Sequence, residues 1–388
     1  MWATLAWVPG GASVWWALPH ASPMSSHRRI SRVFRITALV GACVSIALSA
    51  VPAQAGVANA GVPGASASDP LAGLPWGNYS GPRDEVFPSY RAASGRNRAL
   101  LAKVALRPRV RWFGSWYADD QARQIAASYL ANVTGGNPNV LAQMAVFRME
   151  PWEGTACHSL PTAAQQSSYR TWIDAFAQGI GSARVALVLQ PDLPFSLCVP
   201  GHSLLPLRMI AYAAQVFSAL PHTTVYLDAG AGDWESVGQA SWMLRMAGIR
   251  HVRGFALNAT HYDTTSSQIH FGVRVIRSLA AAGVHGVHFV INTSGNGRGF
   301  TYQQYHGNVH TFGNARVCQG ARNWPCVTLG IPPTSNVASR RWRLSAGERR
   351  LAARYVDAYL WIGRPWLVGQ TDPFDLQRTL LLAASTPF

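Results

Sequence analysis

The residues best placed to do chemistry are aspartates that follow short apolar runs. Asp192 follows the run VALVLQP, Asp228 ends TTVYLD, and Asp372 and Asp375 follow AYLWIGRPW near the C-terminus. In α/β folds the functional residues lie at the carboxyl ends of parallel strands, so we expect these carboxylates to meet at one edge of a sheet. Carboxylates surrounded by tryptophans are typical of sites that cleave glycosidic bonds.

Hydrolysis with inversion needs one carboxylic acid to protonate the leaving oxygen and one carboxylate to activate water, roughly 6.5 to 9.5 Å apart. Asp192 is the candidate acid, and Asp228 on the next strand would hold a proton on it through like-charge repulsion. Asp372 is the candidate base. Asp192 also fits a turn between prolines. Asp372 also fits a helix N-cap, with Pro373 at the first helical position and Asp375 in the first turn.

Aromatic residues at or just past the apolar runs are candidate platforms for sugar rings, because sugars stack their apolar faces on indole rings. They are Trp112, Trp116, Trp152, Trp234, Trp361 and Trp366. Core packing is the alternative for about half of them. Trp234, in a glycine-rich loop six residues after Asp228, is the favoured platform. Asn258 and Arg364 end two other runs and are candidates to bind sugar hydroxyls, with capping or surface roles as alternatives.

Seven apolar runs alternate with segments of helical periodicity, which predicts a parallel α/β sheet. The runs cover residues 108–116, 141–148, 185–190, 224–228, 252–257, 287–291 and 358–362. Closing this sheet gives a distorted seven-stranded barrel in a single domain. An open doubly wound sheet is the alternative, but no G-x-G-x-x-G segment follows the first run. The long insert 293–345 is expected to form a loop over the site.

The N-terminus has the pattern of a targeting segment. A basic stretch after Met24 precedes an apolar stretch and an A-x-A sequence ending at Ala55, which predicts a secretory signal cleaved after Ala55. An uncleaved membrane anchor is the alternative. We therefore expect an extension and signal over residues 1–55, a Gly/Ala/Ser/Pro-rich linker or arm over 56–100, and a catalytic domain over 101–388.

Four cysteines follow the predicted signal: Cys157, Cys198, Cys318 and Cys326. An even number in an exported protein favours disulfide bonds, and three pairings are possible. We favour Cys157–Cys198 and Cys318–Cys326. No C-x-x-C segment or matched Cys/His pair indicates a metal site, and we expect no cofactor.

The chain is basic, with a formal net charge of +16. Four arginines precede residue 56, which leaves a net charge of about +12, and Lys103 is the single lysine. The arginines are spread along the sequence without a nucleic-acid-binding motif, so we expect no nucleic-acid partner. The bias toward arginine is typical of GC-rich coding. We expect a secreted or wall-associated monomer that does not bind membranes after signal cleavage, with loose attraction to anionic wall polymers.

Five segments resemble, in the same order, those of glycoside hydrolase family 6, the inverting endoglucanases and cellobiohydrolases that act on β-1,4-glucan. They are LVLQPDLPF, VYLDAGAGDW, GFALNATHYDTT, VHFVINTSGNGRG and YVDAYLWIGRP, and the resemblance runs from about residue 108 to the end. It implies a distorted barrel of seven parallel strands. It also implies Asp192 as acid, Asp228 as supporting aspartate, Trp234 as platform, Asn258 and Arg364 as hydroxyl ligands, and 157–198 as the family's first disulfide.

The chain departs from the family pattern at four positions near the predicted site: Arg148 for tyrosine, Ala156 for aspartate, Gln190 for glutamate and Ala231 for histidine. Glu153 or Glu150 would replace the missing aspartate with shifted geometry. We therefore predict a secreted hydrolase of β-1,4-glucan that is most similar to endoglucanases. The alternatives are a secreted sugar-binding protein that has lost turnover and a hydrolase of a non-cellulosic wall glycan.

Overall fold

The computed structural model describes residues 69–305, 309–320 and 323–388. The predicted signal peptide and its cleavage site lie outside these residues. Within the described part, no helix combines the length and apolar character needed to cross a bilayer.

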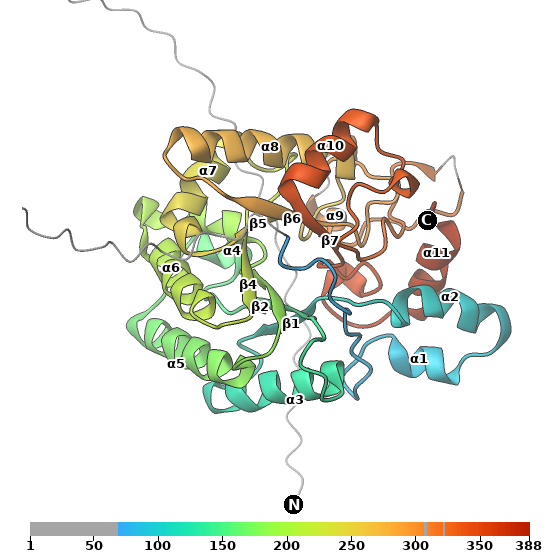
Figure 1. Cartoon of the computed structure of the whole chain (residues 1–388), viewed down its shortest axis with the longest axis horizontal. Coiled ribbons are helices and arrows are strands. Elements are labelled where there is room, and N and C mark those ends of the chain that lie inside the picture. Colours follow the sequence, from blue (N-terminus) through green and yellow to red (C-terminus); the bar gives the residue numbers. More distant parts are fainter. Residues whose placement is uncertain (1–68, 306–308, 321–322) are drawn as a thin grey trace, which may run out of the picture. The chain divides into compact units, whose positions relative to one another are not determined.

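A single sheet of seven parallel strands, paired in chain order, forms the centre of the fold (Figure 1). Its strands are β1 (Arg111–Gly114), β2 (Ala142–Phe147), β3 (Val185–Leu189), β4 (Thr223–Asp228), β5 (Gly254–Leu257), β6 (His288–Asn292) and β7 (Val356–Leu360). The sheet curls so that its ends approach, since the Val110 amide donates to the Trp361 carbonyl at 3.0 Å. The predicted distorted barrel of seven strands is confirmed.

The two faces of the sheet bury different side chains. The concave face carries small or β-branched residues at its middle level: Ala145, Val188, Ala256, Val290 and Ala358. Their small volume suits the narrow interior of a barrel with few strands. The convex face carries larger apolar residues that pack against the surrounding helices.

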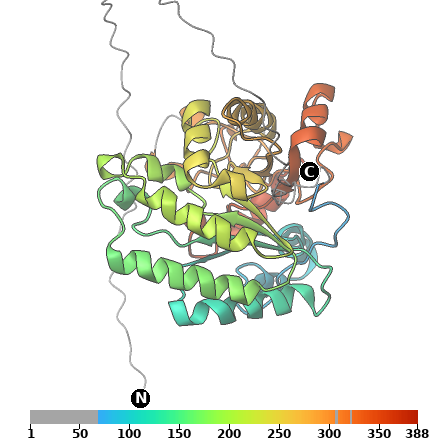
Figure 2. The ribbon, with the colours of Figure 1, turned by 60° about the vertical axis from the view of Figure 1, so that its left-hand side comes forward.

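The helices surround the sheet, and the longest of them cover its convex face. They are α1 (Phe87–Ala92), α2 (Gly95–Ala105), α3 (Ala122–Thr134), α4 (Glu153–Ala156), α5 (Ala163–Ile180), α6 (Leu205–Ser218), α7 (Val237–Met246), α8 (Thr265–Ala281), α9 (Val309–Phe312), α10 (Ala346–Tyr355) and α11 (Leu376–Ser385). Figure 2 shows α3, α5 and α6 side by side. Serine or threonine N-caps begin α5, α7 and α10, each with a glutamine or glutamate three residues later that closes a capping box.

The described part of the expected linker is folded onto the domain. Leu71 is fully buried, and the Gly77 amide and Pro75 carbonyl both hydrogen-bond to Leu141 at the start of β2. Helix α2 packs against α11. Residues 69–100, the described part of the segment expected to be a linker or an arm, therefore pack against the domain as an arm.

The amino-terminal end of the barrel is filled by a charged cluster around Asp357. This buried carboxylate accepts two hydrogen bonds from Arg253, both at 2.9 Å, and one from the Tyr226 hydroxyl at 2.7 Å. His288 Nδ1 lies 3.0 Å from it. The opposite, carboxyl end of the sheet carries the predicted site.

Candidate active site

Left-handed backbone conformations gather at the carboxyl edge of the sheet. Of the seven non-glycine residues with positive φ in the described chain, five lie in this region: Glu153, Gln190, Asp192, Asn258 and Gln370. Such conformations are unfavourable for residues with a Cβ atom, and they are concentrated at functional sites. The backbone thus singles out the edge that the aspartates had predicted.

Asp192 is held from two sides just beyond β3. Its carboxylate Oδ1 accepts a hydrogen bond of 2.7 Å from the Thr260 hydroxyl, in the loop after β5. Its own amide donates to Asp228 Oδ2 at 2.9 Å, from the end of β4. With 5% of its surface exposed, Asp192 is fixed in position rather than free in solvent.

Burial raises the pKa of Asp192, while the Thr260 hydrogen bond and the charge of His261 lower it in part. Burial also raises the pKa of Asp228, and the charge of Asp192 raises it further. Burial and the mutual charge therefore both favour the protonated forms of these two carboxyl groups. The structure brings the predicted acid Asp192 and its partner Asp228 together. The contact joins the Asp192 amide to the Asp228 carboxylate, and not the two carboxyl groups to each other.

A third carboxyl group, that of Glu153, faces the same cavity as Asp192. Burial raises the pKa of Glu153 to about 8, with the charge of Asp192 as the second cause. The Cys157–Cys198 disulfide joins the end of α4 to the segment η2 (Leu193–Leu197) that follows Asp192. The cavity is lined by Phe147, Met149, Glu150, Pro151, Trp152, Glu153, Ala156, Ser159, Pro161, Gln190, Asp192, Leu193, Phe195, Ser196, Val199 and Pro206.

Arg148 does not place a positive charge in this cavity. Its guanidinium donates to Asp119 at 3.1 Å and to the Ser168 hydroxyl on α5 at 2.7 Å, and it lies 3.9 Å from Glu150, a lining carboxylate that offsets its charge. The Gln190 side chain accepts hydrogen bonds from the amides of Arg148 and Met149, and so ties the ends of β2 and β3 together. Both departures from the family pattern therefore have structural roles here.

Trp234 forms one wall of the site and is backed by a histidine. Its ring stacks on His261 with centroids 5.0 Å apart and 9° between the planes, and it meets Phe195 edge-on at 5.2 Å. His261 Nδ1 lies 2.9 Å from Asp233 Oδ1. Burial lowers the pKa of His261, but the Asp233 charge and hydrogen bond outweigh it and the net pKa is raised. A histidine thus supports this wall although position 231 is alanine.

A second group of aromatic residues lies at the ends of β1 and β2. The Arg364 guanidinium lies 4.7 Å above the ring of Trp112, whose indole nitrogen donates to the Ile362 carbonyl. Trp116 is 46% exposed and meets Trp152 edge-on at 5.9 Å. Trp116 is therefore the most accessible of the predicted platforms, and Trp112 and Arg364 form a single stacked unit.

Two predicted ligands are not available to a sugar. Trp361 is 2% exposed, and its indole nitrogen donates to the Ile331 carbonyl, so it belongs to the core. Asn258 is fully buried and donates to the carbonyls of Asp263 and Asn292, which fixes the loop carrying Thr260. Both sugar-binding predictions are wrong, because these side chains point into packed structure.

Asp372 lies exposed in the loop before α11, where its charge acts on Arg364. The N-cap of α11 is Asp375, which accepts from the Arg378 amide at 2.9 Å, so the expected capping role of Asp372 is wrong. No hydrogen bond or ion pair joins Asp372 to Asp192, both of which are described.

Comparison with known proteins assigns the family. Residues 77–372 match the family model "Glycosyl hydrolases family 6". The chain belongs to this family. It is 34% identical to Endoglucanase 1 of Streptomyces halstedii over 265 residues, which cover 65% of this chain and 78% of the relative. It is 32% identical to Endoglucanase A of Cellulomonas fimi over 224 residues, or 58% of this chain, and the match spans only 47% of that relative.

A solved family 6 structure supports the fold directly. The endoglucanase Cel6 from Mycobacterium tuberculosis, in complex with a methyl-cellobiosyl-4-deoxy-4-thio-β-D-cellobioside, superposes with a TM-score of 0.63 at 26% identity. The superposition covers 82% of this chain and 99% of that chain.

Sequence reasoning missed three residues of this family 6 site. Thr260, His261 and Asp233 all touch Asp192 or Trp234, but only Asn258 was selected from the loop after β5. The signal was present, because residues 258–261 directly follow the fifth apolar run and so lie at the same sheet edge as Asp192. Among the residues that the structure covers, no group of three or more His, Cys, Asp or Glu side chains is arranged to hold a metal ion.

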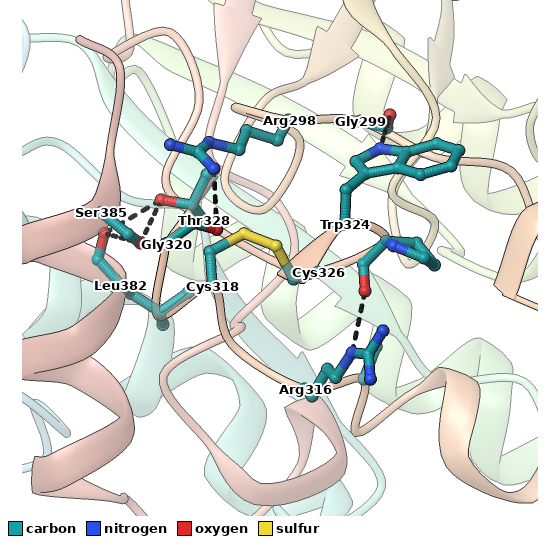
Figure 3. The surroundings of a disulfide bond; sticks show 12 residues. Arg298, Gly299, Arg316, Cys318, Gly320, Trp324, Cys326, Thr328, Leu382 and Ser385 are labelled. Atoms are coloured by element: carbon teal, nitrogen blue, oxygen red, sulfur yellow. Dashed lines mark hydrogen bonds between the residues drawn. A yellow bond between two sulfur atoms is a disulfide. The ribbon is translucent and has the colours of Figure 1, made fainter. Parts of the chain in front are cut away.

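The insert 293–345 contacts the wall that carries Trp234, because the Tyr302 amide donates to Asp233 Oδ2 at 2.8 Å. The Cys318–Cys326 disulfide closes a short loop of this insert (Figure 3). Hydrogen bonds to neighbouring carbonyls hold the loop: Arg298 to Gly320 at 3.1 Å, Arg316 to Pro325 at 3.1 Å and Trp324 to Gly299 at 3.4 Å. These contacts anchor the insert next to the loop that carries Trp234.

Both favoured disulfides are present, and we expect their losses to differ in size. Their sequence separations are 41 and 8 residues, for which the chain-entropy model gives losses of about 4 and about 2.5 kcal/mol. Replacing Cys157 and Cys198 with serine should therefore lower the free energy of unfolding more than the same change at Cys318 and Cys326. Denaturant titration of both double variants measures this, and equal losses would contradict the expectation.

Proposed function

We propose that this protein is a secreted, inverting hydrolase of β-1,4-glucan in which Asp192 is the general acid. The observation that carries the proposal is the Asp192 carboxyl group, buried next to Asp228, oriented by Thr260 and facing a cavity at the carboxyl edge of the sheet. Relatives named endoglucanases and a solved relative bound to a cello-oligosaccharide analogue support the choice of substrate.

In the proposed reaction Asp192 gives its proton to the glycosidic oxygen as the bond from that oxygen to the anomeric carbon breaks. A water molecule attacks the anomeric carbon from the opposite face and loses a proton to a base, which inverts the configuration. Asp372 is the proposed base, acting directly or through a water chain. No metal or organic cofactor takes part in this scheme.

Glu153 and Asp228 keep the acid protonated in this scheme. Burial raises the pKa of each carboxyl group, so that near neutral pH the cluster retains protons that Asp192 can donate. Glu153 takes over the part of the missing aspartate at Ala156. It does so from the start of α4, which the Cys157–Cys198 disulfide fixes relative to Asp192.

The proposed sugar contacts follow the aromatic residues that remain accessible. Trp234, stiffened by His261, supports a ring on one side of Asp192. Trp116 does so near the ends of the first strands, and Arg364, stacked on the buried Trp112, is proposed to bind sugar hydroxyls there. Secretion is supported by the two disulfides and by the signal-peptide pattern of the N-terminal sequence. The protein is proposed to act as a monomer.

The purified protein is expected to release reducing ends from soluble β-1,4-glucan. NMR of the first products should show the α-anomer from the β-linked substrate. Glucan binding without product would instead favour the sugar-binding alternative that the substitutions at positions 148, 156 and 231 suggest. If the protein hydrolysed only mixed-linkage glucan or another wall glycan, that polymer would replace β-1,4-glucan as the proposed substrate. A β-anomeric first product would exclude inversion.

A further inference from the structure

The basic charge of this chain is concentrated in one part of the sequence. Residues 265–356 hold eleven arginines and a single acidic residue, Glu348. In the rest of the chain after residue 55, the 18 basic and 16 acidic residues nearly balance. GC-rich coding explains arginine in place of lysine, but it does not explain the lack of acidic residues, which also have G- and C-containing codons.

The exposed positions of two helices in this range are basic or small. On α8 they are His270, Arg274, Arg277 and Ala281, at helical spacing along one stripe. On α10 they are Ala346, Arg350, Ala353 and Arg354. Neither exposed stripe contains a carboxylate.

The two helices that carry these stripes lie next to each other. Helices α8 and α10 pack together and appear as neighbours in Figure 1. Ser266 and His270 of α8 both contact Glu348 of α10, with His270 Nε2 at 3.8 Å from its carboxylate. Because Arg274 and Arg277 follow His270 at spacings of four and seven residues, they share that side of α8.

Two more exposed arginines, Arg340 and Arg341, lie in the short helix η7 (Arg340–Trp342) that leads into α10. We call this surface the basic face: Arg274, Arg277, Arg340, Arg341, Arg350 and Arg354. No ion pair with a carboxylate of the described residues neutralises any of the six. The face lies on the outer helical layer of the barrel, so it is separate from the proposed glucan site.

We propose that the basic face binds an acidic polysaccharide, a polymer with one carboxylate on each sugar unit. Guanidinium groups bind carboxylates through two parallel hydrogen bonds, which favours arginine for this purpose. Arginines three or four residues apart on a helix, as in Arg274/Arg277 and Arg350/Arg354, have Cβ atoms about 5 to 6 Å apart. This spacing is close to the length of one sugar unit. A fold with two disulfides belongs to an oxidising compartment, where wall polysaccharides are more accessible than nucleic acids.

Such binding would hold the protein in mixed polysaccharide material while the glucan site stays free. The probe is polygalacturonate, and the parent is expected to bind it with an affinity that falls steeply as salt rises. The test variant changes Arg274, Arg277, Arg350 and Arg354 to glutamine. The control variant changes the same number of exposed arginines on other surfaces: Arg96, Arg107, Arg123 and Arg208.

We expect the test variant to bind polygalacturonate at least about tenfold more weakly, while the control with the same net charge changes by less than about threefold. Melting temperatures and hydrolysis of neutral soluble glucan should be unchanged in both variants. Equal weakening in both variants would reduce the effect to net charge and overturn the proposal. So would a parent that binds duplex DNA at the same salt but not polygalacturonate, which would instead indicate a nucleic-acid surface.

Discussion

Replacing Asp192 with alanine is expected to lower kcat/KM for soluble β-1,4-glucan by about 10²- to 10⁴-fold, the range that a positioned general acid contributes. The Asp192 carboxyl group is buried and oriented by the Thr260 hydroxyl, and its backbone amide is held by Asp228. Binding of cello-oligosaccharides should change little, because the platforms at Trp234 and Trp116 remain. Initial-rate kinetics and calorimetric binding measure the two effects separately.

The loss should depend on the leaving group. An aryl cello-oligosaccharide that releases an acidic phenol needs little protonation, so the alanine variant should lose much less activity on it than on glucan. Asp120→Ala is a suitable control, since Asp120 is an exposed aspartate that makes no ion pair in the described structure. An equal loss on both substrates would indicate that Asp192 supports the fold or substrate binding rather than donating a proton.

The sheet and its functional edge could be predicted because they depend on local patterns. Seven short apolar runs separated by helical segments leave few alternatives to a curled parallel sheet, and carboxylates at the run ends mark one edge. The disulfides also followed from a small set of pairings. The positions of Asp192 and Asp228 were correct for this reason, since each belongs to the strand end itself.

The errors arise where the direction of a side chain decides its role. On β7 and just after it, Ala358, Leu360 and Ile362 face the barrel interior. Trp361 lies between them in sequence, so it points outward into the hydrophobic core outside the barrel. Counting the strand period of two from Ala358 would have excluded it. Asn258 follows β5 at an inward position, but its left-handed backbone turns the amide into hydrogen bonds with neighbouring loops. The spacing of residues along the sequence does not predict loop geometry of this kind.

Glu153 is a second residue whose role the sequence did not decide. The sequence placed Glu153 and Glu150 on equal terms as replacements for a missing aspartate. The difference lies in their surroundings. Glu150 lies near charged and polar partners, with Arg148 at 3.9 Å and Gln165 at 3.4 Å, whereas burial and the charge of Asp192 raise the pKa of Glu153. A sequence does not reveal which of two nearby carboxylates will be desolvated.

Glu153→Gln is accordingly expected to lower kcat/KM on glucan most strongly at alkaline pH, by about tenfold at pH 8 and little at pH 5. With a pKa of about 8, Glu153 keeps a proton in the cluster up to that pH. In the variant Asp192 titrates without this partner, so the alkaline limb of the pH–rate profile moves to lower pH. Glu150→Gln is the matched control and should leave the limb in place.

Stability provides an independent readout of the same group, with a defined sign. Because the pKa of Glu153 rises from 4.5 to about 8 on folding, the folded state binds more protons than the unfolded state between these values. Its contribution to stability therefore falls as pH rises from about 4.5 to 8. Glutamine does not titrate, so Glu153→Gln should raise the melting temperature relative to the parent at pH 8 more than at pH 5. A variant that loses activity equally at both pH values, with no such gain in melting temperature, would remove Glu153 from the proton-sharing cluster and leave Asp228 as the sole partner of Asp192.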